Sequence, residues 1–124
     1  MSDALVIIPT YNEIENISAM LDAVMALKQG FDVLVIDDAS PDGTADCVRK
    51  KQIEYPGRIF LETRAGKLGL GTAYIHGFKY ALARGYDYII EMDAVFSGLT
   101  ASADLPHYYR SHRTVMVCNQ YHIL

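Results

Sequence analysis

Two patterns of apolar and polar residues alternate along this chain, and they predict strands and helices in turn. Runs rich in β-branched and other apolar residues predict five buried strands, at 4–9, 31–37, 57–63, 86–93 and 114–119. Segments with apolar residues at helical spacing predict helices between them, at 13–27 and 69–85. Residues 40–51 predict a turn followed by a helix, and 103–112 a short helix interrupted near Pro106. Asn12 is the expected cap of the first helix, and Asp42 that of the second. Repeated strand–helix units of this length predict an α/β fold, with a mainly parallel sheet and helices on both faces.

The length and composition of the chain fit one domain with a hydrophobic core. It has 124 residues, of which 51% are hydrophobic and 21% charged. A net charge of -4, with scattered lysines and arginines, argues against nucleic acid as a partner. Cys47 and Cys118 lie far apart and form no CxxC motif, which indicates reduced thiols and a cytoplasmic protein. No apolar run is long enough for a signal peptide or a membrane span, and the sequence does not indicate an oligomeric state.

Polar and glycine-bearing segments follow the first four predicted strands. These segments are PTYNE, DDASPDGT, TRAGKLGLG and DAVFSG. In open α/β sheets, ligands bind outside the carboxyl ends of the strands. The sequence therefore predicts a ligand site at this edge of the sheet.

Asp37 and Asp38 end the second predicted strand. Adjacent residues on a strand point to opposite faces, so the two carboxylates are not expected to serve one ligand. One could accept hydrogen bonds from a base or a ribose while the other caps the following turn. A purely structural role for both, in organising that turn, is an equal alternative.

The glycine-rich segment 66–71 leads into the third predicted helix. Backbone N–H groups there could hold a phosphate, with Lys67 as a point charge. The segment has neither the dinucleotide-binding order of glycines nor the spacing of a P-loop. A tight turn with close helix packing is the alternative interpretation.

Asp93 ends the fourth predicted strand, where an Asp-x-Asp pair would hold Mg²⁺ or Mn²⁺ against a diphosphate. Val95 occupies the second position of that pair, and valine cannot bind a metal. Since Mg²⁺ usually keeps several waters and needs one or two carboxylates, Asp93 together with substrate phosphates predicts a weakened metal site.

Four stretches of the sequence together resemble family 2 glycosyltransferases of the GT-A fold. They are VIIPTYNEIENI, VLVIDDASPDGT, GKLGLGTAYIHGFKYAL and YIIEMDA. Within that family the chain is most similar to dolichol- or polyprenol-phosphate mannosyltransferases. The resemblance implies a Rossmann-like, nucleotide-binding half-domain.

The resemblance also implies an activity and a set of site residues. The activity is the transfer of mannose from GDP-mannose to a polyprenyl phosphate, with inversion, at the cytoplasmic face of the membrane. The positions that match nucleotide-sugar-binding residues of the family are Pro9, Tyr11, Glu13, Ile36, Asp38, Asp93 and Ala94. The same resemblance makes Asp93 the catalytic and metal-binding carboxylate.

The sequence departs from the family pattern from about residue 95 onward. Val95 replaces the second aspartate, and Gln120 stands where the family has an arginine. Family catalytic domains are also longer than this chain. We therefore expect residues 1–124 to form a single, truncated nucleotide-sugar-binding domain.

Four other functions compete with this interpretation. The first is a truncated, non-catalytic module that binds a nucleotide without turnover, and the second is a family 2 transferase with another donor, such as UDP-glucose. A phosphoacceptor receiver domain needs its acidic pair after the first strand, whereas Asp37 and Asp38 follow the second. A dinucleotide dehydrogenase needs a glycine fingerprint after the first strand, which is missing here.

Overall fold

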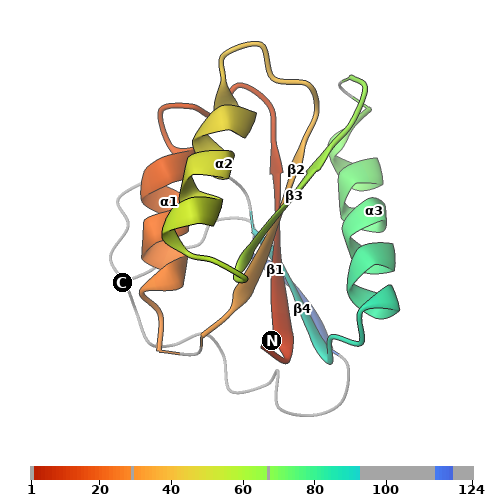
Figure 1. Cartoon of the computed structure of the whole chain (residues 1–124). Helices are drawn as coiled ribbons and strands as arrows, with labels where there is room; N and C mark the ends of the chain where they lie inside the picture. The colour runs from red at the N-terminus through yellow and green to blue at the C-terminus, as the bar shows by residue number, and fades with distance from the viewer. Residues whose placement is uncertain (1, 29, 67, 93–113, 119–124) are drawn as a thin grey trace.

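The chain folds into a three-layer α/β structure built on a five-stranded parallel sheet (Figure 1). The computed structural model describes residues 2–28, 30–66, 68–92 and 114–118. The strands are β1 (Ala4–Thr10), β2 (Asp32–Asp37), β3 (Ile59–Thr63), β4 (Tyr88–Met92) and β5 (Thr114–Cys118). The helices are α1 (Ile17–Met25), α2 (Thr44–Glu54) and α3 (Leu70–Ala83). This arrangement confirms the predicted fold class.

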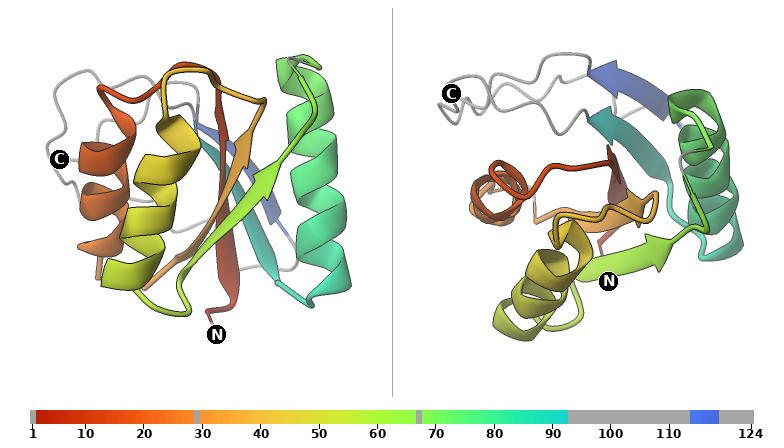
Figure 2. Two further views of the ribbon diagram at one scale, coloured as in Figure 1. Left: turned by 45° about the horizontal axis from the view of Figure 1, so that its top comes forward. Right: turned by 90° about the horizontal axis from the view of Figure 1, so that it is seen from above.

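The strands lie in the order β3-β2-β1-β4-β5, and every neighbouring pair is parallel. The chain first winds outward from β1 to β3, then crosses back and adds β4 on the other side of β1. Helices α1 and α2 cover one face of the sheet and α3 covers the other (Figure 2). The direction of winding thus reverses between β1 and β4, and in α/β sheets this switch point is where the crevice for a ligand opens.

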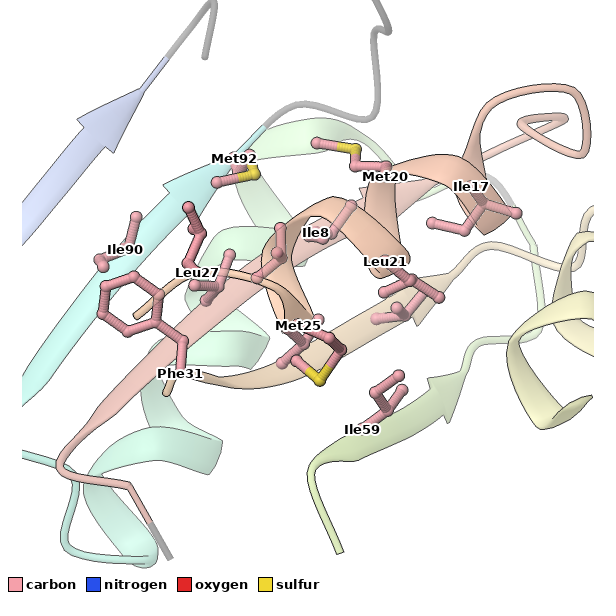
Figure 3. Close-up of a cluster of buried hydrophobic side chains, with 14 of the residues drawn as sticks. Ile8, Ile17, Met20, Leu21, Met25, Leu27, Phe31, Ile59, Ile90 and Met92 are labelled. Atoms are coloured by element: carbon pink, nitrogen blue, oxygen red, sulfur yellow. The ribbon is translucent and has the colours of Figure 1, made fainter. Parts of the chain in front are cut away.

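Alternate residues of the central strands enter two separate cores. On β1, Val6 and Ile8 face α1 and α2, whereas Leu5 and Ile7 face α3. The larger core also takes in apolar side chains of α1 and the segment that follows it (Figure 3). Because the strands are covered on both faces, they read as continuous apolar runs rather than as an alternating pattern.

Helix α3 packs against the sheet through small residues. Ala73 and Ala81 are buried on this face, and Gly77 lies between them, each four residues from the next. An ideal Cβ atom built at Gly77 would come within 2.6 Å of Ile7 Cδ1. The missing side chain therefore lets the axis of α3 approach β1 closely.

The largest difference from the predicted elements lies at the start of the first helix. The helix begins at Ile17 rather than at residue 13, with Asn16 as its N-cap residue. Asn12 has a left-handed backbone, with φ of 55°, so the predicted capping role of Asn12 is wrong. The second helix begins at Thr44 and runs to Glu54, with Gly43 as its N-cap residue, so the prediction of Asp42 as the N-cap is wrong by one residue. The helix predicted at 103–112 lies outside the described residues.

Candidate functional site

The candidate site lies at the carboxyl edge of the sheet, which faces the viewer in the right panel of Figure 2. The loops after β1, β2 and β3 meet there, and β4 ends at the same edge because all the strands are parallel. Among the predicted site residues, the structure describes Pro9, Tyr11, Glu13, Ile36 and Asp38. The other predicted residues, Lys67, Asp93 and Ala94, lie outside the described residues, as does Val95.

Three consecutive backbone N–H groups of the loop after β1 donate to side chains of the loop after β2 and of the first residue of α2. Asn12 N donates to Ser40 Oγ at 2.9 Å. Glu13 N donates to Thr44 Oγ1 at 3.1 Å, and Ile14 N donates to Asp42 Oδ2, also at 3.1 Å. These bonds fix one loop against the other. They also occupy N–H groups that a dinucleotide-binding fold would aim at a pyrophosphate.

Asp37 holds the end of β2 to β1 and to the turn that follows. Its buried carboxylate accepts a hydrogen bond from Thr10 Oγ1 at 2.7 Å. It also accepts bonds from Ser40 Oγ at 2.6 Å and from Ser40 N at 3.0 Å. Ala39, in the turn, has φ of 54°, a strained value for a residue with a Cβ atom. Asp37 is therefore the member of the acidic pair that caps the turn.

Asp42, between β2 and α2, joins the loop after β1 to the start of α2. Besides Ile14 N, its carboxylate accepts a bond from Thr44 N at 3.0 Å, in the first residue of α2. Burial opposes ionisation of Asp42, but the hydrogen bonds from Thr44 and Ile14 outweigh it and lower the pKa of the carboxyl. Asp42 thus satisfies an N–H group at the start of α2 from one position before the N-cap, Gly43.

Asp38 points away from Asp37 and forms an ion pair with Arg64. Arg64 Nε lies 2.6 Å from Asp38 Oδ1, and Arg64 Nη2 lies 2.8 Å from Asp38 Oδ2. Both side chains are 9% exposed. The two carboxylates of the pair therefore serve different partners, as the alternation of strand residues requires.

The remaining described residues of the predicted site differ in exposure. Tyr11 is 38% exposed and carries an aromatic ring to the edge of the sheet. Pro9 and Glu13 are half-buried. The Ile36 side chain is fully buried in the core beneath α3. Its position beside a bound base, which the resemblance implies, stays a prediction.

Two charged residues near this edge were not predicted from the sequence. Glu91, on β4, is 8% exposed, and burial raises the pKa of its carboxyl. A glutamate within an apolar strand is a visible signal that sequence analysis could have used. Arg64 gives no such signal, because its partner Asp38 lies 26 residues earlier in the chain.

Within the described residues, no group of three or more histidine, cysteine, aspartate or glutamate side chains could hold a metal ion. In the same part of the chain, none of the helices has the length and apolar character needed to cross a membrane.

Comparison with known proteins shows which family this chain is similar to. The family model for glycosyl transferase family 2 matches residues 5–94, which include β1 to β4 and the segments that follow the first three strands. Undecaprenyl-phosphate mannosyltransferase of Micrococcus luteus is 46% identical over 110 residues, 89% of this chain and 44% of that protein. Polyprenol monophosphomannose synthase of Mycolicibacterium smegmatis is 44% identical over 90 residues, 73% of this chain and 34% of that protein.

A solved structure supports the same relationship. The mannosyltransferase PcManGT of Pyrobaculum calidifontis, in complex with GDP-Man and Mn2+, superposes with a TM-score of 0.61 at 30% identity. The match covers 64% of this chain and 24% of that one. The chain spans less than half the length of the curated relatives it matches. On the extent of the family match and on its shared fold, the chain belongs to glycosyltransferase family 2.

Proposed function

We propose that this chain is the donor-binding part of a mannosyltransferase that acts on a polyprenyl phosphate, with GDP-mannose as the donor. The observation that carries the proposal is that β2, β1 and β4 are neighbouring parallel strands, so that Asp38, Tyr11 and the end of β4 all lie at the carboxyl edge of the sheet. Support comes from the relatives, which are named as undecaprenyl-phosphate and polyprenol mannosyl enzymes, and from a solved neighbour that holds GDP-Man and Mn2+.

The site residues divide between the nucleoside and the diphosphate. Tyr11 and Asp38, together with Pro9, Glu13 and Ile36, form the nucleoside side of the proposed site. Tyr11 supplies an aromatic surface on which a base can stack. The diphosphate side consists of Lys67, Asp93 and Ala94.

The acceptor in this reaction is a phosphate monoester, whose second pKa is about 6. Such an acceptor is largely dianionic at neutral pH, so it needs little help from a general base. The demanding step is departure of the nucleoside diphosphate, which leaves with added negative charge. A divalent cation, Mg²⁺ or Mn²⁺, offsets that charge when bound, and Asp93 is the carboxylate of this chain that would hold it.

A single displacement inverts the configuration of the sugar's anomeric carbon. An acceptor phosphate oxygen forms the new bond while the bond to the diphosphate breaks on the opposite side. Because the lipid chain of a polyprenyl phosphate stays in the bilayer, we place the reaction at a membrane surface, with the protein bound peripherally on its cytoplasmic face.

The experiment is calorimetric titration of the 124-residue chain with GDP, GDP-mannose and UDP-glucose, each with Mn²⁺ and with a chelator. We expect both guanine nucleotides to bind more tightly than UDP-glucose, and Mn²⁺ to strengthen their binding. Preference for UDP-glucose would assign a different donor, and failure to bind any of the three would overturn the proposal.

A non-catalytic nucleotide-binding module is the second candidate, and Val95 in place of a second carboxylate is the observation that favours it. The two candidates differ in turnover. A transfer assay with GDP-mannose and a short polyprenyl phosphate, run on the chain that binds GDP, distinguishes them.

A further inference from the structure

Arg64 follows β3 at the carboxyl edge and contacts three residues, which belong to two parts of the site. Its guanidinium binds Asp38 through two nitrogens, Nε and Nη2. Arg64 Nη1 lies 3.1 Å from Thr72 Oγ1, in the first turn of α3. Arg64 Nη2 lies 3.3 Å from the carbonyl oxygen of Gly69, the N-cap residue of that helix. One side chain therefore joins the end of β2 to the start of α3.

The glycine-rich segment reaches back to the same carboxylate. Leu68 N lies 3.3 Å from Asp38 Oδ2, so Asp38 holds both Arg64 and the backbone of the segment. Gly69 has φ of 100° and ψ of 148°, a conformation open essentially to glycine. This conformation accompanies the bonds that its carbonyl oxygen accepts from Arg64 Nη2 and from Thr72 Oγ1, the latter at 2.8 Å.

The energetics of the pair favour a positional role over a stabilising one. Removing two charges from water costs about as much as their attraction returns, so a buried ion pair is a weak source of stability. A guanidinium bound through two nitrogens does fix direction, since its donors form a rigid planar fork. By contrast, the pair between Arg49 and Asp46 on α2 is 54% and 77% exposed and connects two residues of one helix.

We infer that Arg64 is a positioning residue of the nucleotide site. It sets Leu68, Gly69 and the first turn of α3 at a fixed place relative to Asp38, and the affinity for the donor depends on that placement. The inference rests on the proposed function, because it takes Asp38 and residues 68–71 to be the two sides of the GDP pocket.

The test is calorimetry with GDP on the wild-type chain and on Arg64→Ala, Arg64→Lys and Arg49→Ala. Arg64→Ala should weaken GDP binding about tenfold, the equivalent of one charge-assisted hydrogen bond. Arg64→Lys keeps the charge but loses the fork, so its affinity should stay below that of the wild type. Arg49→Ala, the matched control on an exposed ion pair, should bind GDP like the wild type.

Chemical rescue separates positioning from a general loss of structure. Millimolar methylguanidinium should restore GDP affinity in Arg64→Ala, because it can occupy the space next to Asp38, and should not restore it in Asp38→Ala. A merely structural role would lower the melting temperature and the fraction of binding-competent molecules, with the Kd of the folded fraction unchanged.

A second variant keeps the inference testable if Arg64→Ala does not fold. Thr72→Val leaves the ion pair intact and removes the hydroxyl that accepts from Arg64 Nη1 and donates to Gly69 O. Because Arg64 Nη2 still reaches Gly69 O, the variant should weaken GDP binding less than Arg64→Ala does, about threefold. Wild-type affinity in both Thr72→Val and Arg64→Lys would overturn the inference while leaving the proposed function standing. A wild-type chain that does not bind GDP would overturn both.

Discussion

Gly77 of α3 lies so close to Ile7 of β1 that a Cβ atom at position 77 would come within 2.6 Å of Ile7 Cδ1 and 2.8 Å of Ile7 Cγ2. Real Cβ atoms essentially never approach another heavy atom so closely, so Gly77→Ala must displace the helix or the isoleucine. We expect a loss of about 1–3 kcal/mol in the free energy of unfolding, the usual cost of overpacking. Urea denaturation measures it.

Gly71 is the matched control for this prediction, since it lies in the same helix with no atom within 4 Å of an added Cβ. Gly71→Ala should be neutral or should gain up to about 1 kcal/mol from helix propensity. Ile7→Val removes the nearest clashing atom, Cδ1, and should return part of the stability of Gly77→Ala. Equal stability of Gly77→Ala and Gly71→Ala would contradict the close packing of α3.

Asp37 and Asp38 should differ in what their loss affects. Asp37→Ala leaves the buried hydroxyl of Thr10 and the donors of Ser40 without an acceptor, so it should lower the free energy of unfolding by about 2 kcal/mol or more. Asp38→Ala should reduce nucleoside diphosphate binding more than Asp37→Ala does. Thermal unfolding and calorimetry on both variants measure the two effects, and equal losses of affinity would return both residues to a structural role.

Val95→Asp should repair the predicted metal site. A carboxylate at position 95 adds a second charged ligand to that of Asp93. Mn²⁺ should therefore strengthen GDP-mannose binding by about 1–3 kcal/mol more in Val95→Asp than in the wild type. Titration of both proteins with Mn²⁺ and with chelator measures the gain. If Val95→Asp gains nothing from Mn²⁺, or if the wild type already binds Mn²⁺ tightly with turnover, position 95 is not a damaged ligand position.

Asp42 should contribute to the acid sensitivity of the fold. Its pKa is lower in the folded chain than the ordinary value of 3.8, so the folded state favours the ionised form. The resulting stability is fully present above that ordinary value and is lost as the pH falls through the lowered, folded-state pKa. Asp42→Asn should therefore flatten the acid limb of a plot of melting temperature against pH.

The control for Asp42→Asn is Asp46→Asn, also near the start of α2. Asp46 is 77% exposed and pairs with Arg49 on the surface, an arrangement that contributes little to stability. An acid limb that changes as much in Asp46→Asn as in Asp42→Asn would argue against the bridging role of Asp42.

The sequence predicted the strands well because burial on both faces leaves a strong local signal. Runs such as residues 4–9 are continuously apolar and end at a proline or at acidic residues, and the structure places β1 from Ala4 to Thr10. The order of the strands followed less directly, from the general behaviour of strand–helix units. The start of α1 was predicted four residues too early, because the polar residues near it resemble a capping box.

The contacts of the candidate site were harder to predict, since they join residues distant in sequence. That Asp37 and Asp38 serve different partners follows from strand geometry alone. The register of β2 against β3 decides which of the two aspartates caps the turn and which one pairs with Arg64. That register is set by the packing of both sheet faces and has no local signature.

The three hydrogen bonds from residues 12–14 to the loop after β2 have a consequence for how the chain tolerates mutation. The donors belong to the backbone, which every residue except proline supplies, whereas the acceptors are the side chains of Ser40, Asp42 and Thr44. The shape of the first loop is thus encoded largely in the second. In a library selected for folded protein, position 14, whose isoleucine is 43% exposed, should accept many residues except proline. Positions 40, 42 and 44 should retain few alternatives, so most of the sequence constraint on the first loop falls about 30 residues downstream of it.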